Sequence, residues 1–147
     1  MAVTSQQAGP AAGSVVGGRP HFAHVSVTVT DIAAADRFYG DAIGLAKLPR
    51  PDFGFPGSWY ALGCGLELHL IVNPDLRRPD DERLGFEVRY PHFALAVEDA
   101  DQVHAALLRA GLKVDELRSS PTGMRQLFVK DPDGNMVEFI GPGRMAG

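Results

Sequence analysis

Three of the five histidines lie in short segments in which apolar and polar residues alternate. His24 opens the first of these segments and His92 opens a later one, while His69 lies two positions after Glu67 in a third. Side chains at alternate positions of a strand point to the same face, so each imidazole is expected opposite the apolar residues of its strand. Neutral imidazole is a common ligand of divalent metal ions, and the pattern therefore indicates metal-ion chemistry.

A carboxylate near the end of the chain completes this set of donors. Glu138 lies in the segment 136–140, directly after the turn sequence Asp-Pro-Asp-Gly-Asn. Together with His24 and His92 it offers two nitrogens and an oxygen to Zn²⁺, Ni²⁺, Mn²⁺ or Fe²⁺. A lone histidine is more often an ordinary core or surface residue, but burying several such groups without an ion leaves polar atoms unpaired at roughly 1–3 kcal/mol each. We therefore predict that these three residues are metal ligands and that Glu138 also moves a proton.

The fourth ligand has two candidates on one strand, Glu67 and His69, whose side chains face the same way. When Gly65 is aligned with Gly134 in the later turn, His69 falls opposite Glu138. When Gly63 is aligned with Gly134 instead, Glu67 takes that place. We predict that His69 is the ligand. Glu67 remains the alternative ligand and a second candidate for the catalytic base.

The candidate ligands belong to two copies of one pattern, a strand followed by a helix and three further strands. The same interval separates His24 from His92 and Asp31 from Asp99, and each aspartate precedes a helical run as its N-cap. Both helical runs end at a glycine, which is typical of a helix C-terminus. The sequence thus predicts an α+β fold of two tandem βαβββ modules.

The predicted modules occupy residues 21–73 and 91–147, and residues 21–141 form one compact domain. Residues 1–20 are rich in small residues and show no periodicity, so a disordered N-terminal extension is expected. Residues 74–90 combine prolines with a dense mixture of charges and no pattern, which predicts a solvated connector.

The composition is that of an ordinary globular protein, with 147 residues of which 45% are hydrophobic and 22% charged. A formal net charge of −4 gives no reason to expect nucleic acid or an anionic membrane as a partner. The single cysteine, Cys64, fits a reducing compartment. We find neither a membrane-spanning apolar run nor the order of charges typical of a secretory signal, so we expect a cytoplasmic protein.

Five short sequences occur in a fixed order over residues 22–141: HVSVTVTD, DRFYGDAIGL, LELHLI, HFALAV and DPDGNMVEFI. In combination they resemble the glyoxalase/bleomycin-resistance/extradiol-dioxygenase superfamily, the vicinal oxygen chelate proteins. The resemblance implies modules that pair edge to edge as a curved mixed sheet around a metal-binding cleft, with ligands on the first and last strands of each module. It also implies a homodimer.

The function expected from this resemblance is that of a divalent-metal-dependent lyase or isomerase of the glyoxalase type, acting on a small oxygen-chelating substrate. A ligand set of His24, Glu67, His92 and Glu138 would resemble glyoxalase I, whereas His69 in place of Glu67 removes one negative charge and one base. Two other functions stay open. One is an Fe²⁺ extradiol-type dioxygenase, and the other is a bleomycin-resistance-like protein that binds a drug without metal.

Several other side chains have weaker functional signals. Arg125 is a candidate contact for an anionic group of the substrate near the cleft. The rings of Phe53, Phe55, Trp59 and Tyr60 are compatible both with a pocket wall and with packing at the core or rim. His104 lies within a helical run and is expected to face solvent.

Overall fold

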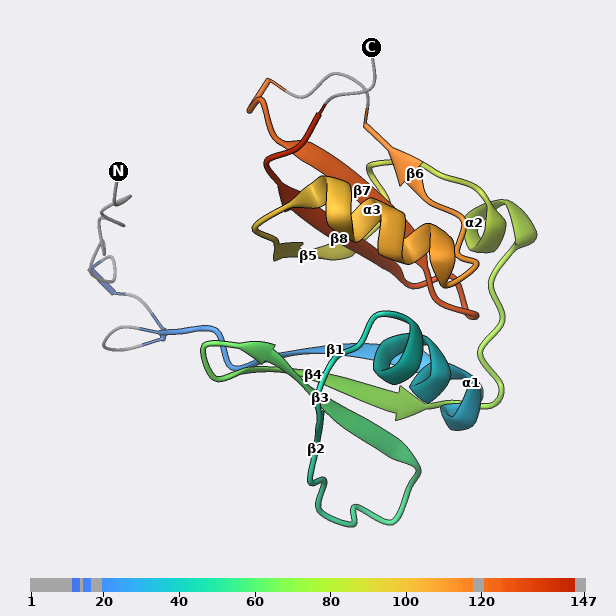
Figure 1. Cartoon of the computed structure of the whole chain (residues 1–147). Coiled ribbons are helices and arrows are strands. Elements are labelled where there is room, and N and C mark those ends of the chain that lie inside the picture. Colours follow the sequence, from blue (N-terminus) through green and yellow to red (C-terminus); the bar gives the residue numbers. More distant parts are fainter. Residues whose placement is uncertain (1–11, 14, 17–19, 118–120, 145–147) are drawn as a thin grey trace.

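The computed structural model describes residues 12–13, 15–16, 20–117 and 121–144. It confirms the α+β fold of two βαβββ modules, each built on a four-stranded mixed sheet with a helix on one face (Figure 1). The N-terminal extension predicted for residues 1–20 lies largely outside the described residues.

The first module carries His24, Glu67 and His69 on two adjacent strands. Its strands follow the order β1-β4-β3-β2, in which β1 runs parallel to β4 and the other pairs are antiparallel. Its elements are β1 (His24–Val29), α1 (Ile32–Asp36), η1 (Arg37–Ala42), β2 (Lys47–Leu48), β3 (Gly57–Gly63) and β4 (Leu66–Val72).

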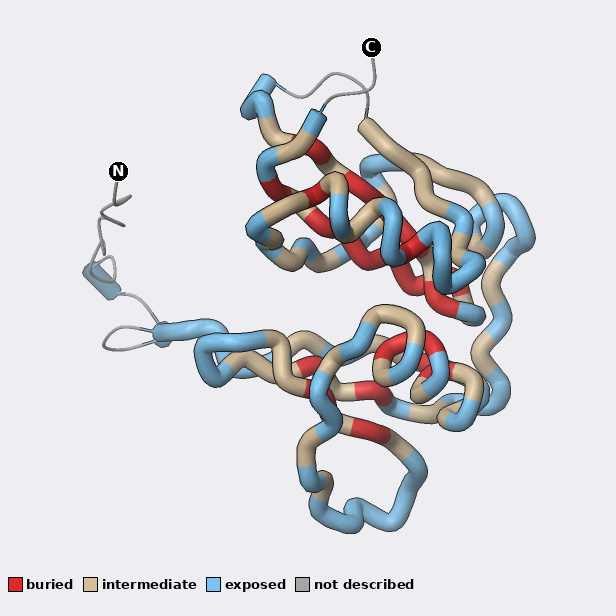
Figure 2. Tube along the Cα trace, viewed as in Figure 1, coloured by how far each residue is buried: buried red, intermediate tan, exposed pale blue. Residues whose placement is uncertain are grey.

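The second module repeats this topology in the order β5-β8-β7-β6, with β5 parallel to β8. Its elements are β5 (His92–Ala96), α3 (Ala100–Arg109), β6 (Asp115–Glu116), β7 (Arg125–Lys130) and β8 (Met136–Gly141). Figure 2 shows that buried positions run along β7 and β8 and recur in the central strands of the first module. None of the helices in the described residues has the length and apolar character needed to cross a membrane.

The predicted N-caps hold both helices. Asp31 accepts a hydrogen bond from the backbone N–H of Ala34 at 3.0 Å, and Asp99 accepts from the N–H groups of Asp101 and Gln102. The first helix differs from the prediction because α1 continues as a π-helical segment, η1. This wider turn is accompanied by burial of the neighbouring rings of Phe38 and Tyr39, which an α-helix would direct about 100° apart.

The connector between the modules contains a short helix, α2 (Asp80–Leu84), where the sequence pattern predicts none. Three acidic residues occupy its first turn and Arg83 its last, an arrangement that the helix dipole favours. The residues after α2 pack on the second sheet, where the Phe86 ring lies 5.0 Å from that of Phe128. The connector is therefore an ordered cover over part of this sheet.

The turn at residues 131–135 joins the two modules. The Tyr39 hydroxyl of the first module donates to Asp131 at 2.9 Å, and the Thr30 hydroxyl donates to Asp133 at 2.6 Å. The side-chain amide of Asn135 donates to the Thr28 carbonyl at 2.8 Å. β1 and β5 are both edge strands, and no ladder joins them in the part of the chain that the structure describes. The modules are thus held by this turn and by side-chain packing, and their sheets remain separate.

The contribution of the Tyr39 hydrogen bond to the free energy of unfolding should be lost at alkaline pH. Burial and the neighbouring Asp131 raise the pKa of Tyr39. A tyrosine whose pKa is higher in the folded state stabilises the fold below its unfolded pKa of about 10, and this contribution is lost as the pH rises through the folded pKa. We expect Tyr39→Phe to lower the free energy of unfolding by about 1–2 kcal/mol near neutral pH, and this difference to shrink at alkaline pH. Urea unfolding over a pH series measures it; a difference that stays constant contradicts the assignment.

Candidate metal centre

His24, Glu67 and His69 form the first half-site, on one face of the first sheet. The strand register pairs His24 with Glu67 and Ser26 with His69, and residues paired in this way point to the same side. His69 Nε2 lies 2.8 Å from Glu67 Oε2. The His69 ring stacks on one side against His24 at a centroid distance of 4.2 Å and on the other against Trp59 at 4.1 Å.

His92 and Glu138 form the second half-site, on the second sheet. His92 Nε2 lies 3.1 Å from Glu138 Oε2. His92 Nδ1 lies 2.7 Å from the Tyr90 carbonyl oxygen. The other carboxylate oxygen of Glu138 accepts a hydrogen bond from the side-chain amide of Gln126 at 2.8 Å. Glu138 is buried, with 7% of its side chain exposed.

The tautomer of His92 follows from these contacts. A carbonyl oxygen only accepts, so Nδ1 carries the proton that bonds to Tyr90, and in the neutral ring Nε2 then presents a lone pair. This lone pair faces the carboxylate of Glu138, and two acceptors so close require a proton or a cation between them. Metal-bound histidines in general donate their second N–H to a carbonyl or carboxylate. The second half-site therefore fits a metal ion by the chemistry of its donors.

The register also relates the two half-sites. Ser26 pairs with His69 in the first sheet, and Ala94 pairs with Glu138 in the second. Each of these pairs lies two positions after the histidine that opens its strand. His69 is therefore the counterpart of Glu138, while Glu67 corresponds to Met136.

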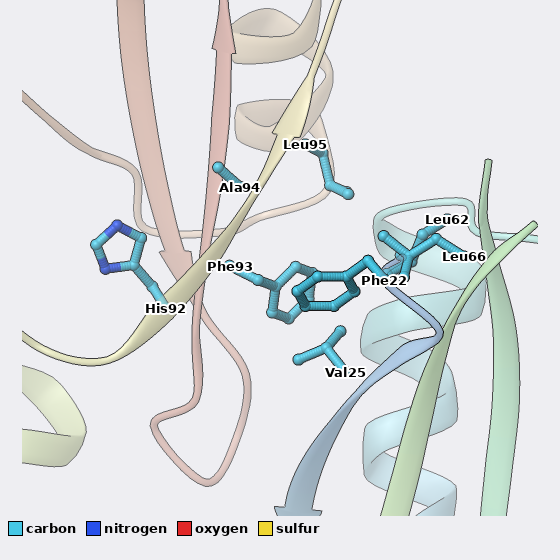
Figure 3. A pocket seen from close by; sticks show the side chains of 8 residues that line it. All are labelled: Phe22, Val25, Leu62, Leu66, His92, Phe93, Ala94 and Leu95. Carbon is cyan, nitrogen blue, oxygen red and sulfur yellow. The ribbon is translucent and has the colours of Figure 1, made fainter. Parts of the chain in front are cut away.

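The two half-sites do not converge within one chain. Among the described residues, no three His, Cys, Asp or Glu side chains lie so that they could hold one metal ion. Figure 3 shows the His92 ring pointing away from the apolar side chains between the modules, such as Phe93 of the second module and Val25 of the first. The pocket between the modules, of about 340 Å³, has His92 among its lining residues but not Glu138, and its other lining residues are apolar.

Arg125 does not lie at the candidate site, contrary to the expectation from sequence. It is 7% exposed, and its guanidinium contacts Glu116 at 2.7 Å, Asp101 at 2.8 Å and His104 Nδ1 at 2.8 Å. His104, which the sequence predicts to face solvent, instead packs against Arg125 and is half-buried. The hydrogen bonds that Arg125 donates to Glu116 raise the pKa of Arg125, against the opposing effect of burial. This cluster is a structural ion-pair network on the face away from Glu138.

Sequence reasoning missed Gln126 as the partner of Glu138. Its signal is the alternation within β7, which places Gln126 on the same face as Phe128, the residue paired with Glu138. The contact between Gln126 and Glu138 could not be predicted from the sequence, because it depends on the register in which β7 pairs with β8.

The family described as Glyoxalase/Bleomycin resistance protein/Dioxygenase superfamily matches residues 21–139. The chain belongs to this superfamily. A lactoylglutathione lyase of Neisseria meningitidis serogroup A is 30% identical over 122 residues, which cover 80% of this chain and 87% of the relative.

Solved structures of the superfamily share the fold. A putative glyoxalase family protein from Bacillus anthracis superposes with a TM-score of 0.69 at 25% identity, covering 84% of this chain and 95% of the other. TnmS3, an antibiotic binding protein from Streptomyces sp. CB03234, superposes with a TM-score of 0.63 at 26% identity, covering 84% of this chain and 96% of the other. The proteins to which this chain is similar thus include both a lyase and an antibiotic binding protein.

Proposed function

We propose that the protein is a divalent-metal-dependent lyase or isomerase of the glyoxalase type, acting on a small substrate that chelates the ion through oxygen. The observation that carries the proposal is the orientation of His92, whose Nδ1 is held by the Tyr90 carbonyl while Nε2 faces Glu138. The similarity to a lactoylglutathione lyase supports the same reaction class.

The proposed ligands are His24, His69, His92 and Glu138. A bound divalent ion would supply Lewis-acid polarisation of a substrate oxygen. Glu138 is the proposed base, because Gln126 fixes one of its carboxylate oxygens and leaves the other, Oε2, to hold or move a proton. Glu67, with Oε2 beside His69, is the second candidate base.

We further propose that the protein acts as a homodimer in which the first half-site of one copy meets the second half-site of the other. The separation of the half-sites within the chain supports this assembly, since a second copy can bring both to one ion. His24 and His92 are both exposed in the single chain, which leaves their strands accessible to a partner.

Metal analysis of protein purified without added metal tests the proposed function. We expect it to retain a transition metal, and to take up more on titration with Zn²⁺, Ni²⁺, Mn²⁺ or Fe²⁺. The same samples are assayed for lactoylglutathione lyase activity, with and without a chelator. Less than about a tenth of an equivalent of metal, with no uptake on titration, contradicts the proposal. Iron retention with ring cleavage of catechols would assign the protein to the dioxygenases instead.

The fourth ligand is tested by two matched variants. We expect His69→Ala to weaken metal binding at least about a hundredfold, because outer partners of ligands alone account for about 10–100-fold. Glu67→Gln keeps an acceptor for the His69 ring and removes only the charge, so we expect a change of only a few-fold. Titration calorimetry with one metal ion measures both. The reverse order of effects would transfer the role of ligand to Glu67.

Metal-independent binding of a small molecule is the second candidate function. It is favoured by the apolar pocket of about 340 Å³ between the modules and by the similarity to TnmS3. Under this alternative, replacing Glu138, which does not line the pocket, leaves ligand binding intact, whereas the proposed enzyme loses both metal and activity.

A further inference from the structure

A continuous row of rings extends from the first half-site across the first sheet to the loop before β3. The His24, His69 and Trp59 rings stack in sequence, with interplanar angles of 12° and 6°. The row continues from Trp59 to Phe53, and from Phe53 to Phe55, each at a centroid distance of 5.9 Å. The candidate ligands His24 and His69 thus lie at one end of a row whose other rings, those of Trp59, Phe53 and Phe55, are not proposed ligands.

The outer end of this row is open to solvent. Phe53 is 52% exposed and Phe55 is 43% exposed. The core lies on the opposite face of the same sheet, where Tyr60 and Leu68 are 1% and 0% exposed. Packing of the core therefore does not require the two phenylalanines, and grouped exposed rings of this kind mark ligand sites.

Arg50 places a positive charge at the open end. Its guanidinium carbon lies 5.0 Å from the centroids of both phenylalanine rings. No carboxylate in the described part of the chain forms an ion pair with Arg50. Gly57 makes room for this arrangement, since a Cβ atom there would lie 2.9 Å from Arg50 Nε and would collide with the Leu70 carbonyl. The charge is therefore positioned by the fold and left available to an anion.

We propose that this aromatic row and Arg50 form a recognition site for a planar aromatic group bearing an anionic substituent, such as an aromatic carboxylate. The flat group lies against the exposed rings of Phe53 and Phe55, and the anion pairs with the Arg50 guanidinium. Within the proposed function, this site would bind the part of the substrate remote from the chelating oxygens. That link rests on the proposed function, whereas binding of the aromatic anion does not.

The probe for this site is naphthoate, a planar aromatic carboxylate. It is titrated into the full chain by calorimetry and followed in NMR spectra by the indole N–H signal of Trp59, which is unambiguous because the chain has one tryptophan. Cyclohexanecarboxylate is the control for planarity, and naphthylmethanol is the control for charge. We expect naphthoate to bind at least about tenfold more tightly than either control and to shift the Trp59 signal.

Four variants separate the contributions. Arg50→Gln is expected to weaken naphthoate binding about tenfold, and Phe53→Leu about three- to tenfold. The matched controls are Arg109→Gln, at the exposed end of α3, and Leu108→Ala, an exposed apolar side chain of the same helix outside the row. Both controls should bind naphthoate like the wild type. Equal binding of naphthoate and cyclohexanecarboxylate, or no effect of Arg50→Gln, overturns the proposal.

Two further measurements separate this proposal from the proposed enzyme function and from a subunit interface. Metal content is measured in every sample: naphthoate binding without any metal uptake supports the aromatic site and overturns only the proposed enzyme function. Sedimentation velocity tests whether a second copy covers the row. If naphthoate fails to bind and Phe53→Leu shifts the protein toward monomer, the rings belong to a subunit interface and the proposed site is wrong.

Discussion

The Asp131→Ala variant is expected to lose roughly 3–5 kcal/mol of the free energy of unfolding, a large fraction of a typical domain's stability. Asp131 is 4% exposed and lies where the two modules meet. One of its carboxylate oxygens accepts from the Tyr39 hydroxyl and the Asn135 amide, and the other from the backbone N–H groups of Asp133 and Asn135. Removing the carboxylate leaves these buried donors without an acceptor.

Burial raises the pKa of Asp131, while the hydrogen bonds from Asn135 and Tyr39 oppose the shift. Asp131→Asn is therefore the informative companion variant. This variant avoids burying a charge but turns an amide N–H₂ toward donors. We therefore expect its free energy of unfolding to lie between those of the wild type and Asp131→Ala. Asp75→Ala, at an exposed position of the connector, is the control and should change stability by less than about 0.5 kcal/mol. Urea unfolding measures all three; an Asp131→Ala variant as stable as the control would refute the role of this turn.

Local signals in the sequence were sufficient to predict most elements of this fold, but not the short helix α2. Asp31 and Asp99 cap helices, and Gly44 and Gly111 end them with φ values of +83° and +77°, because each of these functions is decided within a few residues. Alternation likewise identifies the strands that carry the histidines. The internal repeat then fixes the βαβββ order.

Features that depend on tertiary partners could not be predicted in this way. The π-helical segment η1 accompanies burial of Phe38 and Tyr39, and Tyr39 meets Asp131 from the other module. Arg125 has the chemistry of an anion-binding residue, but Glu116 of β6 and Asp101 of α3 pair with its guanidinium. The candidate ligands were identified by type and face, whereas their division into two half-sites is set by the arrangement of two separate sheets.

Mixing two inactive variants is expected to restore metal binding if the proposed dimer is correct. The first variant, His24→Ala/His69→Ala, lacks the first half-site, and the second, His92→Ala/Glu138→Gln, lacks the second. Each alone should retain essentially no metal, because every site in its homodimer lacks one half-site. A mixed dimer contains one complete site, formed by the intact half-site of each copy.

Co-expression of the two variants with different affinity tags isolates the mixed dimer. We expect about one metal ion per mixed dimer, and about a quarter of an equivalent per chain in an unfractionated equal mixture with random pairing. Glu138→Gln is preferred to alanine because it keeps a partner for Gln126 in this buried position. Far-UV circular dichroism confirms that both variants fold. If each site is instead formed within one chain, neither chain of the mixed dimer has a complete site and no metal is recovered, which would rule out the shared site.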